Sequence, residues 1–134
     1  MRKAVGITLM LSVCCSQVTK AEELTYGEAE YLNSCVVCHG EYGRGDGPLA
    51  DEMRTAPADL TTLSRSNGGE FPYWKVFALI DGRSVLPGHG SREMPVWGDE
   101  FLTGDVAKYG RYGGEAITQD RIHALSAYIA TLQR

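Results

Sequence analysis

Long glycine-rich stretches separate the short amphipathic segments of this 134-residue chain. Three of them are expected to be loops: Gly40–Pro48, Gly82–Trp97 and Gly104–Gly114. The segments between them carry apolar residues at helical spacing, and none shows the alternation typical of a strand. A compact domain rarely tolerates so much irregular chain unless something else holds the loops. The sequence therefore predicts an all-α domain, three to four helices and long loops wrapped around a bound cofactor.

The predicted helices follow from apolar spacing and from helix start and stop residues. Leu24–Ser34 has few helix breakers, Ala58–Leu63 can form a short turn after a proline, and Phe71–Asp81 stops at a glycine. A last helix is expected to begin at Thr118, a suitable N-cap, and to continue to the C-terminus.

Residues 1–21 have the pattern of a secretory signal. Arg2 and Lys3 precede the apolar run Ala4–Cys15, which is too short to span a bilayer as a helix. Small residues up to Ala21 favour cleavage there, and cleavage after Ser16 is the alternative. The expected mature domain is residues 22–134, exported to the periplasm. A buried N-terminal helix and a lipid-attached N-terminus are the alternative interpretations of this segment.

The charge of the chain limits its partners. Removing residues 1–21 takes away Arg2, Lys3 and Lys20 but no acidic residue, which changes the net charge from −4 to −7. This acidity argues against a nucleic-acid interface and suits partners with basic docking patches. No segment after residue 21 is long and apolar enough to cross a membrane, so we expect a soluble mature protein.

Cys35-Val36-Val37-Cys38-His39 is a C-x-x-C-H sequence, the attachment pattern of c-type haem. Two cysteines three residues apart on a helical turn can each bond one vinyl group of the same porphyrin, and the following histidine can coordinate the iron. The pattern arises by chance in fewer than about one chain in a thousand. We therefore expect one covalent haem c, held through Cys35 and Cys38, with His39 as the proximal iron ligand.

The two cysteines have three other interpretations. A structural zinc site needs four ligands, and Cys14 and Cys15 leave with the signal segment. A redox-active dithiol is typical of a βαβ unit, and this chain shows no strand pattern that could form one. A disulfide between Cys35 and Cys38 is compatible with export, but it leaves His39 and the long loops unexplained.

The chain resembles the class I c-type cytochromes over roughly Leu24–Leu132. The resemblance is carried by a glycine and an aromatic at four-residue steps before the first haem cysteine, and by a leucine and an aromatic in the last helix: Gly27, Tyr31, Cys35, Leu125 and Tyr128. It implies the cytochrome c fold, in which the first and last helices cross and the glycine permits their close approach.

The loop sequence Gly45-Asp46-Gly47-Pro48 resembles the family's loop whose proline carbonyl accepts a hydrogen bond from the proximal histidine. The resemblance implies that Pro48 orients His39 and raises its basicity from outside the coordination sphere. The alternative is that Pro48 only shapes a turn.

Four side chains compete for the distal iron position: Met53, His89, Met94 and His123. Met94 is followed by proline and lies 55 residues after His39, which resembles the methionine loop of the family and favours Met94 as the ligand. His89 occupies the same loop and is the main alternative. Met53 follows the haem motif too closely, and His123 falls within a predicted helix.

Other side chains are expected around the haem. The apolar and aromatic residues of the third helix are predicted to line or support the pocket, and packing in the helix core explains them equally well: Tyr73, Trp74, Phe77, Leu79 and Ile80. Candidate partners for the haem propionates are Trp97, Arg54, Arg65 and Arg83.

Ligation by both His39 and Met94 leaves no iron position for a substrate, which favours electron transfer over catalysis. The expected function is one-electron transfer between a redox protein donor and acceptor, by a monomer or by a subunit of a redox complex rather than by an enzyme. The alternatives are a haem subunit of a larger dehydrogenase or oxidase, and a haem peroxidase or gas sensor with a labile sixth ligand.

Overall fold

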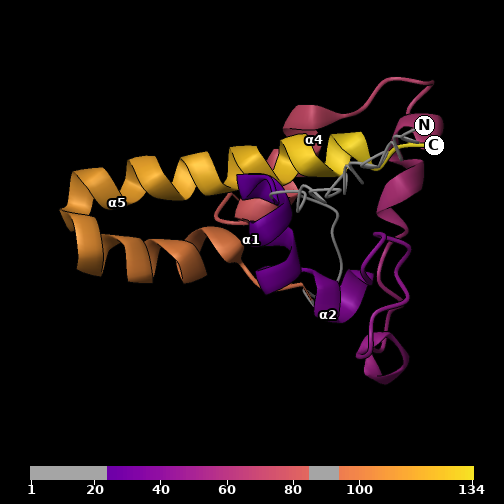
Figure 1. Ribbon diagram of the computed structural model, residues 1–134, viewed down its shortest axis with the longest axis horizontal. Helices are drawn as coiled ribbons and strands as arrows, with labels where there is room; N and C mark the ends of the chain where they lie inside the picture. Colours follow the sequence, from indigo (N-terminus) through magenta and orange to yellow (C-terminus); the bar gives the residue numbers. More distant parts are fainter. Residues whose placement is uncertain (1–23, 85–93) are drawn as a thin grey trace, which may run out of the picture.

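The computed structural model describes residues 24–84 and 94–134. These residues form helices and connecting loops, and none of them belongs to a strand (Figure 1). The elements are α1 (Tyr26–Ser34), α2 (Val36–His39), the 3-10 turns η1 (Ala50–Glu52) and η2 (Leu60–Thr62), α3 (Leu63–Ser66), α4 (Tyr73–Asp81) and α5 (Trp97–Thr131). The predicted all-α class is thereby confirmed for the described part. The expected signal segment and His89 lie outside it.

Helix α1 begins two residues later than the sequence pattern predicts. Thr25 is its N-cap, with a side-chain oxygen that accepts a hydrogen bond from the backbone N–H of Glu28 at 3.2 Å. That bond satisfies one of the unpaired donors in the first turn. The helix ends at Cys35, whose N–H still donates to the carbonyl of Tyr31 at 2.8 Å, so the haem motif begins at the last turn of α1.

The predicted loop Gly104–Gly114 is wrong, because this stretch is helical except at one residue. Gly110 has φ 73° and ψ 173°, a conformation that breaks α5 into a first arm, residues 97–109, and a second arm, residues 111–131. Figure 1 shows the two arms folded back on each other as a hairpin. At Gly114 an added Cβ would lie 2.6 Å from the backbone nitrogen of Val106. This glycine therefore permits close packing between the arms.

The expected N-cap at Thr118 is also wrong. Thr118 lies inside the second arm and is fully buried. Its hydroxyl donates a hydrogen bond to Oδ2 of Asp105 on the first arm at 2.9 Å. A buried hydroxyl and a nearly buried carboxylate satisfy each other in this bond, so the threonine fixes the hairpin instead of starting a helix.

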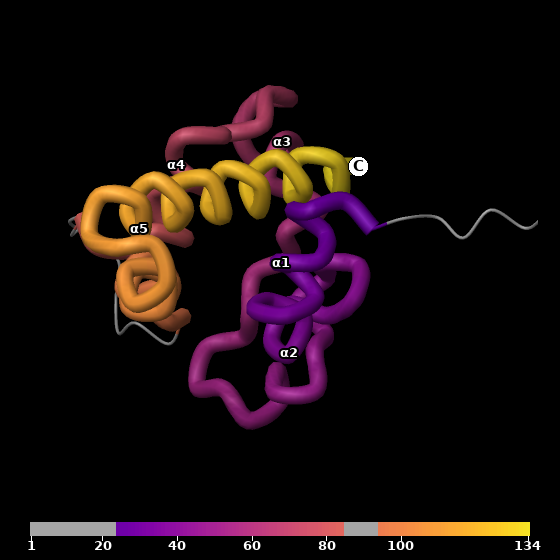
Figure 2. The backbone as a smooth tube through the Cα atoms, turned by 60° about the vertical axis from the view of Figure 1, so that its left-hand side comes forward, coloured from indigo at the N-terminus to yellow at the C-terminus, as the bar shows by residue number. Residues whose placement is uncertain are grey.

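Helix α1 crosses the second arm of α5, as Figures 1 and 2 show. A Cβ on Gly27 would run into the backbone carbonyl of Ala124, so only glycine allows this approach. The rings of Tyr31 and Tyr128 lie 5.3 Å apart at the crossing, and Leu125 is fully buried beneath them. The predicted crossing of the first and last helices is confirmed.

Helix α4 packs against α5 through its buried residues Val76 and Ile80. It ends at Gly82, which adopts the left-handed conformation (φ 65°) typical of a helix C-terminus. The predicted helix Phe71–Asp81 is confirmed with a start two residues later.

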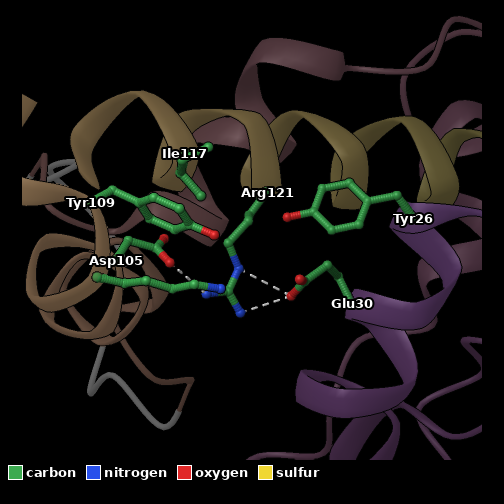
Figure 3. A pocket seen from close by; sticks show the side chains of 7 residues that line it. Tyr26, Glu30, Asp105, Tyr109, Ile117 and Arg121 are labelled. Atoms are coloured by element: carbon green, nitrogen blue, oxygen red, sulfur yellow. Dashed lines mark hydrogen bonds and ion pairs between the residues drawn. The ribbon is translucent and has the colours of Figure 1, made fainter. Parts of the chain in front are cut away.

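Arg121 joins three parts of the fold, and no sequence motif pointed to it. Its guanidinium lies 2.9 Å from a carboxylate oxygen of Glu30 on α1 and 3.3 Å from one of Asp105 on the first arm. The same group stacks over the Phe101 ring, 3.9 Å from the centroid. Figure 3 shows Arg121 between the two carboxylates, with Tyr26 on one side.

Replacing Arg121 with methionine is expected to lower the free energy of unfolding by about 2–3 kcal/mol. The side chains of Glu30 and Asp105 are only 12% and 10% exposed, so the substitution leaves two largely buried charges without their cation. Urea unfolding followed by circular dichroism measures the change. The control is Arg65→Met, at an exposed position of α3, expected within about 0.5 kcal/mol of the parent. Equal effects of both substitutions would contradict the role of Arg121.

Candidate haem-attachment site

The two cysteines of the motif lie one helical turn apart. Cys35 closes α1, and Cys38 lies in α2, where its N–H is 3.2 Å from the Cys35 carbonyl. Cys35 is buried, whereas Cys38 is partly exposed. Both are free thiols, so the structure does not form the disulfide considered as an alternative. Free thiols are what thioether formation with a porphyrin requires.

The two thiols differ in environment. Burial, helped by the negative charge of Glu30, raises the pKa of Cys35 to about 12. A thiol is nucleophilic only as its thiolate, so very little of Cys35 is reactive at pH 8 while the fold is intact.

In haem-free protein, iodoacetamide is therefore expected to label Cys38 well before Cys35. Peptide mass spectrometry over a time course at pH 8 measures the order. The control is the same reaction in concentrated urea, where both thiols are solvated and label at similar rates. Equally fast labelling of both in the folded protein would show that Cys35 is not shielded.

His39 is oriented by a backbone carbonyl of a distant loop. Its Nδ1 lies 3.0 Å from the carbonyl oxygen of Ala58. A carbonyl only accepts hydrogen bonds, so Nδ1 carries the proton, and in the neutral ring Nε2 keeps its lone pair. Burial lowers the pKa of His39, and the bond to Ala58 opposes this only in part. A neutral ring with a free Nε2 is the form that binds a metal.

The predicted role of Pro48 is wrong, because Ala58 supplies the carbonyl that His39 contacts. Pro48 is exposed, and the segment around it serves another purpose. The N–H groups of Gly45, Gly47 and Leu49 donate to the carbonyls of His39, Cys38 and Val37 at 2.8, 3.1 and 2.9 Å. This loop thus satisfies the unpaired carbonyls at the end of α2.

The glycines of the loop let it lie directly against the motif. A Cβ on Gly47 would lie 2.5 Å from the carbonyl oxygen of Val37. Gly40 ends α2 with φ 77°, and its carbonyl accepts a hydrogen bond from the buried hydroxyl of Tyr31 at 2.6 Å. The irregular stretch Gly40–Pro48 is confirmed. Its close packing and backbone hydrogen bonds stabilise the turn that carries Cys38 and His39.

Met94 and the motif share one apolar cluster. Cys35 belongs to the buried core, and Val36 and Met94 pack against that core while remaining partly exposed. Phe77 and Trp97 do the same. A porphyrin is a large apolar ring that can cover such half-buried surface. Two thiols, a neutral imidazole and a thioether are the donor types that hold haem c, so the kinds of residue present fit this group.

The other ligand candidates have different surroundings. The hydroxyl of Tyr73 lies 3.0 Å from Nδ1 of His123, whose ring packs among those of Trp74 and Phe77. This supports helix packing as the role of His123. Met53 is partly exposed after η1.

The side chains predicted around the haem differ in their burial and in their partners. Ile80 is buried in the core, whereas Trp74 is 70% exposed. Arg83 forms a two-pronged ion pair with Glu115, at 2.8 and 2.9 Å, and a further contact with Asp81 at 2.6 Å. The guanidinium is already paired with these two carboxylates, so Arg83 has a structural role in the described fold.

Comparisons with protein-family models, curated proteins and solved structures find no match for this chain. Within residues 24–84 and 94–134, no three His, Cys, Asp or Glu side chains gather as a metal-binding group. No helix in that part combines the length and the apolar character needed to cross a membrane.

Proposed function

We propose that the protein is an exported class I c-type cytochrome that carries single electrons between redox proteins. The observation that carries the proposal is the geometry of the motif. Two free thiols one turn apart precede a neutral imidazole whose Nδ1 is held 3.0 Å from the Ala58 carbonyl. The signal-like pattern of residues 1–21 supports a periplasmic location, since c-type haem is attached outside the cytoplasm in bacteria.

In this proposal the chain holds and tunes the cofactor. Cys35 and Cys38 fix it through thioether bonds, and His39 presents Nε2 because the bond to Ala58 sets its ring orientation and tautomer. Met94 supplies a thioether from the same apolar cluster, a ligand that favours ferrous iron and raises the reduction potential. When bound, haem supplies the reversible one-electron couple. Two protein ligands would leave no iron position for a substrate.

The test uses visible spectra of the purified, haem-loaded protein in both oxidation states. The expected result is reversible one-electron reduction by a chemical mediator, with a reduced form that does not bind carbon monoxide readily at neutral pH. Rapid carbon monoxide binding, or turnover of peroxide, would favour a peroxidase or gas sensor and contradict the carrier function.

A further inference from the structure

The bend of the α5 hairpin forms an exposed tip, residues 108–113. In Figure 1 this bend lies at the end of the hairpin remote from α2. Tyr112 is 91% exposed and Tyr109 47% exposed, and both Lys108 and Arg111 are exposed. Large aromatic side chains left in water at a projecting bend mark a candidate contact surface.

The tip is basic on an acidic chain. Between Asp105 and Glu115 the sequence holds Lys108 and Arg111 and no acidic residue, whereas the whole chain has a net charge of −4. The two flanking carboxylates have closer partners than the tip cations, Asp105 in Thr118 and Arg121 and Glu115 in Arg83.

Neither cation of the tip forms an ion pair with a described carboxylate, although Lys108 hydrogen-bonds to Tyr109 and is attracted by Asp105 at longer range. No carboxylate of residues 24–84 or 94–134 lies within ion-pair distance of Lys108 or Arg111. The ammonium of Lys108 instead lies 4.9 Å from the centre of the Tyr109 ring. The tip therefore offers Arg111 and Tyr112 to solvent, with Lys108 and Tyr109 at its base, where they border a pocket beside Asp105 and Arg121.

The arms beneath the tip are firmly joined. Gly114 packs against Val106, and the buried bond from Thr118 to Asp105 links the arms one turn further down. A surface presented on packed helices loses little conformational entropy when it binds.

We propose that the tip, residues 108–113, is a docking surface for a protein partner with an acidic patch. Tyrosine and arginine are the residue types enriched where binding energy concentrates in protein interfaces. An anionic membrane is a poorer occupant. Basic membrane-binding segments use four to eight cations at about 1 kcal/mol each, whereas the tip has two on a chain that is acidic overall. The inference does not depend on haem, and it adds a second surface to the acidic body of the protein.

The test places a photoreactive benzophenone amino acid at position 112 of the exported protein in cells of the source organism. The expected result is one dominant cross-linked protein, attached through an acidic segment. Lys108→Glu/Arg111→Glu should reduce this product at least about tenfold. Arg65→Glu/Lys75→Glu makes the same change of charge at other exposed positions and should leave it unchanged. Lysine in place of the partner's acidic residues should restore the product with the doubly substituted tip.

Three outcomes would overturn the proposal: no cross-linked protein, a product insensitive to the charge reversal at the tip, or an equal loss in the control variant. Sedimentation with vesicles of phosphatidylglycerol and phosphatidylethanolamine gives a fourth. Vesicle binding by the parent that Lys108→Glu/Arg111→Glu abolishes would assign the tip to a membrane. Thermal unfolding of both variants checks that these exposed substitutions leave the fold intact.

Discussion

Gly27→Ala is expected to lower the free energy of unfolding by about 3 kcal/mol, a large part of the stability of a small domain. The new methyl group would collide with the carbonyl group of Ala124, whose carbon lies 2.8 Å from the Cβ position, and would press on Cβ of Tyr128 at 3.0 Å. Both contacts lie on the second arm, and backbone atoms cannot move aside without separating the helices. Urea unfolding followed by circular dichroism gives the magnitude.

The matched control is Gly104→Ala, a second glycine within a helix. A Cβ at Gly104 would meet nothing within 4 Å, and alanine is the better helix former by about 1 kcal/mol. The substitution should therefore stabilise the protein slightly. Opposite signs at the two glycines are the expected result. A neutral or stabilising Gly27→Ala would mean that the helices do not cross as closely as the structure shows.

Met94→Ala is expected to convert a haem protein that excludes carbon monoxide into one that binds it stoichiometrically. Removal of the thioether leaves the distal iron position to water or to an added ligand. The reduction potential should fall by on the order of 0.1 V, since axial ligands tune haem over a range of about 0.8 V. Carbon monoxide titration of the reduced protein and a redox titration give the two values.

Met53→Ala is the control, because it removes a methionine that is not expected to bind iron. It should leave carbon monoxide exclusion intact. If Met94→Ala still excludes carbon monoxide and His89→Ala does not, then the distal ligand is His89. That outcome would correct the ligand assignment while leaving covalent attachment in place.

The sequence predicted helix positions correctly where the pattern of side chains determines them. Apolar spacing located α1 and α4 to within two residues at their starts, and Gly82 marked the end of α4. The crossing of α1 with the last helix was implied only by the family resemblance that Gly27 and Tyr31 carry, because the spacing of two residues does not by itself say which helix they meet.

Two features were missed because their physical cause does not show in a single segment. Composition does not distinguish a glycine that bends the chain, as Gly110 does with φ 73°, from one that lets helices approach, as Gly114 does. The partner of His39 is a backbone carbonyl, and every residue has one. Pro57 fixes the local path of the chain before Ala58, but no residue pattern indicates that this loop returns to the motif.

The mass of the intact protein tests covalent haem attachment most directly. Made in a host competent for haem ligation, the protein should weigh as much as its processed polypeptide plus one haem, and the group should remain after denaturation. Cys35→Ala/Cys38→Ala should lose that added mass. A parent protein that weighs only as much as its processed polypeptide would contradict the account.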